Sequence, residues 1–212
     1  MRRFMFVSSG LAIALVLLSI PSFAQEIYYP KVEAFGGFSI SSAAVSSVDP
    51  TTGLATSLRE SFMGWQGSVN GNLTHHLAIV GDFGGQYKSL PGVTGAGATV
   101  SGVSLNSYQF LFGPRIMFRR SRITPFVHAM FGGVKEGIGS TTLSILGTSV
   151  TTPAVSSTGL GMAMGGGIDV NLNDRLALRV PQFDWTPMHI GGVWEKNVIR
   201  IGIGLVVKAG GK

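Results

Sequence analysis

Eight ionisable residues occur within stretches that otherwise alternate between apolar residues and small or polar residues. They stand at the same alternate positions as glycine, serine and glutamine, on the face opposite the apolar residues. The eight are Glu33, Asp82, Arg115, His128, Asp169, Arg179, Asp184 and Arg200. A lone charge in apolar surroundings is costly, so we expect these groups to pair with one another. Such a set can form a charged constriction that selects ions, a gate that exchanges partners, or a plug of salt bridges. We favour the plug.

Other residue patterns give little support to catalysis or cofactor binding. The chain has no cysteine, which excludes a thiolate nucleophile, a thiolate metal site and disulfide bonds. Its four histidines include the neighbours His75 and His76, whose side chains would point to opposite faces of a strand. No histidine stands in a His-x-Ser arrangement, and no Lys-Ser/Thr follows the glycine runs as in a phosphate loop. We therefore expect no enzyme, no cofactor and no metal.

The elements that would position the eight residues are about eight stretches with a period of two. The clearest covers residues 107–118, where aromatic and aliphatic residues alternate strictly with Ser107, Gln109, Gly113 and Arg115. This period predicts β-strands with one apolar face, whereas a helix would need periods of three and four. The stretch 175–186 does not keep one phase, because Arg179 and Asp184 would point to opposite sides. A bulge near Pro181 would bring both to the same side.

The connections between these stretches alternate in length. Residues 70–76, 119–122 and 171–175 are short turns, while 41–60, 88–104, 137–157 and 189–196 are longer and rich in Ser, Thr, Gly and Ala. In outer-membrane barrels short turns face the periplasm and long loops face outside. An even number of strands then places both termini on the periplasmic side. By default we expect the long loops to be mobile.

The first 24 residues have the pattern of a secretory signal peptide. Two arginines precede an apolar segment from Phe4 to Ile20, Pro21 ends it, and Ser22-Phe23-Ala24 forms a small-x-Ala cleavage site. A membrane anchor is the less favoured alternative, because the apolar segment is short. We expect residues 25–212 to form one domain.

Composition agrees with strands in a membrane. Charged residues make up 12% of the chain, about half of the roughly 25% in globular proteins. After Ile20, no apolar run approaches the ~20 residues that a spanning helix needs. High mean hydropathy without such runs is typical of membrane barrels. The excess positive charge is scattered along the sequence and does not indicate a nucleic-acid surface.

The sequence resembles a known group of proteins, the small OmpA-like outer-membrane β-barrels. The resemblance covers residues 27–208. It rests on Phe112-Gly-Pro-Arg115 leading into 125–133, on Asp184-Trp185, and on the alternating segment 197–207. These are markers of fold. They imply assembly by the barrel-insertion machinery, and no catalytic residues come with them.

The sequence thus predicts an all-β, eight-stranded, antiparallel up-and-down transmembrane barrel in the outer membrane. We expect a structural role in membrane integrity, with a narrow passive pore as a variant of that role. A lipid-modifying outer-membrane enzyme and a soluble lipocalin-like ligand-binding barrel are the alternatives. Outer-membrane lipid is the expected partner, nucleic acid is not, and the chain is expected to be a monomer.

Overall fold

A computed structural model describes residues 29–48, 55–95, 98–145 and 148–210, and for 44–48 and 55–58 it describes the backbone only. The expected signal peptide, 1–24, lies outside the described residues. In the described part of the chain, no helix is long and apolar enough to cross a membrane. All the regular structure there is β-strand, which confirms the predicted all-β class.

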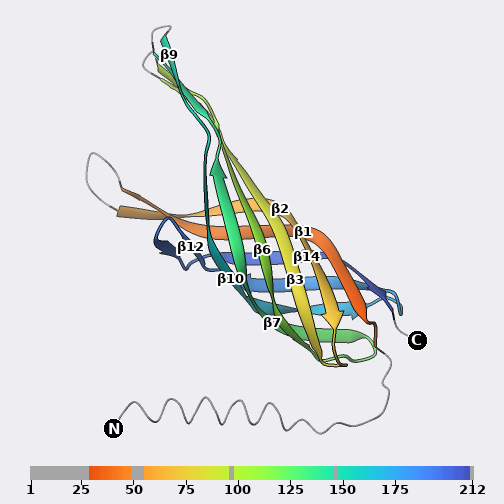
Figure 1. The fold of residues 1–212 in the computed structure, drawn as a ribbon. Coiled ribbons are helices and arrows are strands. Elements are labelled where there is room, and N and C mark those ends of the chain that lie inside the picture. Colours follow the sequence, from red (N-terminus) through yellow and green to blue (C-terminus); the bar gives the residue numbers. More distant parts are fainter. Residues whose placement is uncertain (1–28, 49–54, 96–97, 146–147, 211–212) are drawn as a thin grey trace, which may run out of the picture.

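Eight long strands close into a ring (Figure 1). They are β1 (Val32–Val48), β2 (Ala55–Asn72), β3 (Leu77–Leu90), β6 (Val103–Met117), β7 (Ile123–Ile138), β10 (Val155–Asn171), β11 (Leu176–Trp185) and β14 (Ile199–Ala209). Each strand pairs antiparallel with the next in the chain, β10 pairs with β11, and β14 returns to β1. The ring leaves no open edge and confirms the predicted eight-stranded, up-and-down topology.

The alternation read from the sequence matches the two faces of this ring. In β6, Phe110 and Phe112 are exposed on the outer surface, while Leu111, Gly113 and Arg115, at the alternate positions, are buried inside. The same alternation runs through the other long strands, so the outer surface carries aliphatic and aromatic side chains and the lumen carries the charged ones. This polarity is the reverse of a water-soluble barrel.

The predicted bulge lies in β11. Arg179 pairs with Gly204 and Gln182 pairs with Gly202, so β11 has one residue more than β14 between these two pairs. The extra residue falls at Val180–Pro181 and shifts the facing of the strand by one position. Arg179 and Asp184 consequently both point into the lumen, as the sequence predicted.

The long connections contain more strand than expected. β1 and β2 remain paired out to Val48 and Ala55, inside the segment expected to be a loop. The other connections contain β4 (Val93–Gly95), β5 (Ala98–Val100), β8 (Thr141–Ile145), β9 (Thr148–Thr152), β12 (Met188–Ile190) and β13 (Val193–Glu195). β4, β5, β8 and β9 form a separate four-stranded sheet that extends well beyond the ring (Figure 1). The connections expected to be loops are therefore partly β-strand, and the Thr, Val and Ile residues of these segments favour that structure.

Apolar side chains complete the filling of the lumen. Val80, Leu111, Met130 and Ala163 form one buried cluster. Val134, Met188 and Val198 form another, and Met188 comes from β12, which pairs with the long-loop part of β10. The ring thus encloses a packed interior.

Candidate functional site

All eight residues predicted from the sequence lie in the lumen and are almost inaccessible to solvent. None of them exposes more than 6% of its surface, and Arg115 and Arg179 expose none. They come from seven of the eight long strands, β1, β3, β6, β7, β10, β11 and β14. The ring therefore brings together residues that are up to 167 positions apart in the sequence.

Arg200 lies at the centre of the set and bridges two carboxylates. One of its terminal nitrogens is 2.9 Å from Asp82 Oδ1, and the other is 2.8 Å from Asp184 Oδ2. Gln66 donates a hydrogen bond of 2.6 Å to the second oxygen of Asp82. A Cβ on Gly202 would lie 2.7 Å from Gln66 Oε1, so a larger residue there would displace the Gln66 amide. The planar guanidinium suits this double contact better than an ammonium group would.

His128 connects Arg115 to Asp184. Arg115 Nη2 lies 3.1 Å from His128 Nδ1, and His128 Nε2 lies 2.8 Å from Asp184 Oδ1. A guanidinium can only donate hydrogen bonds, so Nδ1 accepts and the ring proton is on Nε2. His128 is therefore a neutral bridge between a cation and an anion.

A second ion pair joins the same network through an amide. Arg179 donates two hydrogen bonds to the Asp169 carboxylate, at 2.7 and 3.0 Å, in a bidentate arrangement. It also donates to Gln182 Oε1 at 3.1 Å, and Gln182 donates in turn to Asp184 at 2.7 Å. The guanidinium carbons of Arg179 and Arg115 each lie 4.4 Å from the centre of the Phe126 ring. Cation–π contacts with this ring stabilise the two buried guanidinium groups.

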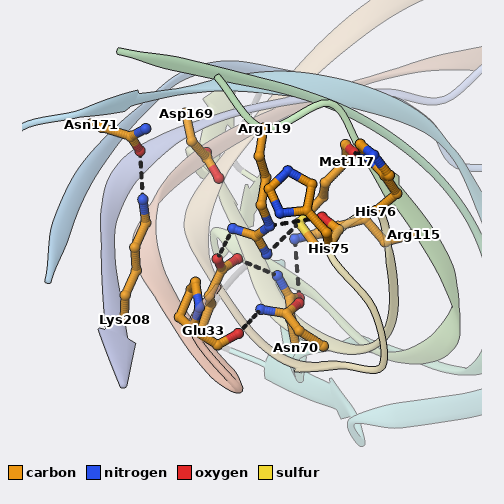
Figure 2. Close-up of polar contacts among 12 residues, drawn as sticks. Glu33, Asn70, His75, His76, Arg115, Met117, Arg119, Asp169, Asn171 and Lys208 are labelled. Carbon is orange, nitrogen blue, oxygen red and sulfur yellow. Dashed lines mark hydrogen bonds and ion pairs between the residues drawn. The ribbon is translucent and has the colours of Figure 1, made fainter. Parts of the chain in front are cut away.

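The network ends at the short-turn end of the barrel (Figure 2). Asn70 accepts a hydrogen bond from Arg115 at 3.0 Å and donates one to Glu33 at 3.3 Å. Arg119 lies 2.6 Å from the other oxygen of Glu33. The sequence placed Arg119 in the short turn 119–122, with a solvated side chain or a lipid-headgroup contact as equal alternatives, whereas the structure places this side chain against Glu33 with only 9% exposure. Its long side chain folds back over the mouth of the lumen, because Glu33 would otherwise lack a cation.

Charge is balanced within the network. It contains four carboxylates, four guanidiniums when Arg119 is included, and one neutral imidazole. Arg115 departs from the expected pairing, since its polar partners are Asn70 and His128, with no carboxylate in direct contact. Its charge is compensated one step away, through His128 to Asp184. With its members joined by hydrogen bonds and ion pairs, and with Gln66 and Asn70 contributed by β2, the arrangement has the features of a plug that ties all eight long strands together.

The other three histidines, His75, His76 and His189, lie outside the lumen network. His76 contacts the Met117 carbonyl at 2.9 Å, and the His189 ring packs against Trp194. The pKa of His75 lies below its ordinary value, because the ring is partly buried and stands beside His76 and Arg119. Within the described ranges, no group of three or more His, Cys, Asp or Glu side chains could hold a metal ion.

Comparison with known proteins finds similarity in structure only. No protein-family model matches the sequence, and no curated protein matches it. Ail, the attachment invasion locus protein of Yersinia pestis, superposes with a TM-score of 0.53 at 12% identity over 84% of this chain and 99% of Ail. Neisserial surface protein A gives a TM-score of 0.49 at 13% identity over 86% of this chain and 99% of its own length.

The fold is that of a small outer-membrane β-barrel. The resemblance to OmpA-like barrels inferred from the sequence is thereby confirmed at the level of fold. A lipocalin-like arrangement is contradicted, because that fold needs an apolar interior and a polar exterior. In this barrel the eight charged or ionisable residues of the predicted set face the interior, and apolar residues such as Phe110 face the exterior.

Sequence reasoning missed four members of the network. Asn70, Gln66 and Gln182 were not assigned to the charge network, and Arg119 was assigned to a turn. Uncharged amides do not stand out among the polar residues of alternating strands. A usable signal was present in Arg119, because it follows β6 directly and its side chain is long enough to reach the lumen.

Proposed function

We propose that this protein is an outer-membrane component that supports the membrane mechanically and does not conduct solutes. It would span the bilayer with its eight long strands, with the short turns and both termini on the periplasmic side. The apolar side chains that face outward along the long strands support the proposal that lipid surrounds the barrel. Trp65, Tyr87 and Tyr108 contact one another toward the long-loop end, a position that suits a membrane interface.

The observation that carries the proposal is the occlusion of the lumen. The charged residues of the lumen expose at most 6% of their surface, which supports a lumen that is closed by side chains. An ion that crossed would have to break hydrogen bonds among groups that have no water to replace them. A buried network that links all eight long strands instead favours a rigid cylinder, which is the property that a structural component needs.

Planar bilayer recording tests this proposal. After reconstitution, insertion is verified by protease protection of the strands and by the heat-dependent shift of the folded band on gels. We expect no discrete conductance steps above the bare-bilayer baseline at either polarity. Regular steps from verified, inserted protein would contradict the structural role and favour a narrow passive pore.

A further inference from the structure

The positive charge of the protein is concentrated at one end of the barrel. In the lumen network acids and arginines cancel, and the long-loop end carries nearly equal numbers of each sign. Among the residues that the structure describes, the short-turn end, by contrast, carries five basic side chains outside the network and one acidic side chain, Asp174. The five form what we call the basic arc, and they are Lys31, Arg120, Arg122, Arg175 and Lys208.

Backbone contacts make the basic arc continuous. Asn171 binds the turn between β6 and β7, since its amide donates to the Arg120 carbonyl at 3.2 Å and its N–H to the Arg122 carbonyl at 2.8 Å. The N–H of Lys208 donates to the Arg175 carbonyl at 2.8 Å. The side chain of Lys208 also contacts Asn171, as Figure 2 shows. The basic residues of two neighbouring turns are thus held beside the end of β14.

The second feature of the basic arc is that its side chains are not paired with acids in the described part of the chain. Arg120, Arg122 and Arg175 are exposed, and among the described residues none of the five basic-arc side chains forms an ion pair. Charges held close together without counter-charges repel one another, and an external anion relieves that repulsion. The arc is therefore complementary to an anionic ligand.

A surface hollow beside the basic arc indicates what kind of group the anionic ligand carries in addition to its charge. It measures about 540 Å³ and is lined by Asn173, Asp174, Arg175, Leu176 and Val207. Leu176 and Val207 are paired across β11 and β14 and face outward onto the apolar exterior. The hollow thus begins at a basic turn and continues onto the surface that faces hydrocarbon. A molecule with an anionic head and an apolar tail matches both parts.

We propose that the basic arc and this hollow bind an anionic phospholipid, with the phosphate at Arg120, Arg122 and Arg175 and an acyl chain against Leu176 and Val207. The inference rests on the membrane location in the proposed function. Each Lys or Arg near an anionic membrane surface contributes attraction, so lipid choice would depend on the three arginines together. The site would also anchor the short-turn end at one defined depth in its leaflet.

Native mass spectrometry of the full barrel in detergent tests the proposal, with phosphatidylglycerol and phosphatidylcholine of identical acyl chains as probes. We expect a dissociation constant at least ten times lower for phosphatidylglycerol. The triple variant R120Q/R122Q/R175Q should lose this preference. The matched control R59Q/K135Q/K196Q removes the same charge from exposed positions at the long-loop end and should keep it.

Three results would overturn the proposal. They are equal affinity of the unmodified barrel for both lipids, a preference retained by R120Q/R122Q/R175Q, and a preference lost in the control variant. Soluble glycerol phosphate at the same concentration should not displace the lipid, and displacement would show that the site takes a free phosphate instead. Comparison of the two lipids on the unmodified barrel needs no variant to fold. Bilayer silence is measured separately, so either proposal can fail alone.

Discussion

Replacing Arg200 by alanine is expected to lower the free energy of unfolding by about 3–5 kcal/mol. Arg200 neutralises Asp82 and Asp184 together, at 2.9 and 2.8 Å, and all three side chains are buried. Without it, two carboxylates remain in the lumen with only neutral hydrogen-bond donors. Urea unfolding of the barrel in phosphatidylcholine vesicles, followed by tryptophan fluorescence and by the shift of the folded band, measures the loss.

One further variant separates the charge of Arg200 from the planar shape of its guanidinium group, and another serves as a control. R200K keeps the charge but cannot bridge two carboxylates with a planar fork, so its loss should lie between that of R200A and zero. R59A removes an exposed arginine and should change the free energy by no more than about 0.5 kcal/mol. Equal unfolding midpoints for R200A and the unmodified barrel would show that the lumen is hydrated and that the network does not hold the strands.

Introducing lysine at Phe110 is expected to cost about 2–4 kcal/mol or to block insertion. Phe110 lies near the middle of β6, faces outward and is 67% exposed in the isolated barrel. Val150 offers a matched control, since it is 65% exposed but belongs to β9 in the sheet beyond the ring. F110K would place an ammonium group in hydrocarbon, whereas V150K would place it in water.

The measurement is the yield and urea midpoint of folding into vesicles for both variants. We expect F110K to fold poorly and V150K to match the unmodified chain. If F110K is as stable as V150K, the outer surface of β6 does not face lipid, and the assignment of the apolar exterior fails.

The fold was predictable because strands at a boundary between two solvents leave a period of two in the sequence. That period located the eight long strands, and the phase conflict between Arg179 and Asp184 located the bulge at Val180–Pro181. The outer parts of the long loops were not predictable in this way. Segments such as β8 and β9 are surrounded by water, so their Ser and Thr residues show no contrast between faces.

The membership of the lumen network was largely predictable, and its pairing was not. A charge in an alternating stretch of glycine and apolar residues stands out, which identified the eight residues. Their partners depend on the stagger between strands around the ring, and single strands do not encode that stagger. Hence neither the double contact of Arg200 nor the neutral bridge through His128 could be read from the sequence.

The central claim is that lipid surrounds the apolar exterior of the barrel, and accessibility of spin labels tests it most directly. Labels at Phe110, Met164 and Ile203 report on three outward positions, and a label at Val150 serves as the water-exposed control. In reconstituted vesicles we expect the first three labels to collide with dissolved oxygen and to be shielded from an aqueous nickel complex, with the reverse at Val150. Aqueous accessibility and shielding from oxygen at the three outward positions would contradict the account.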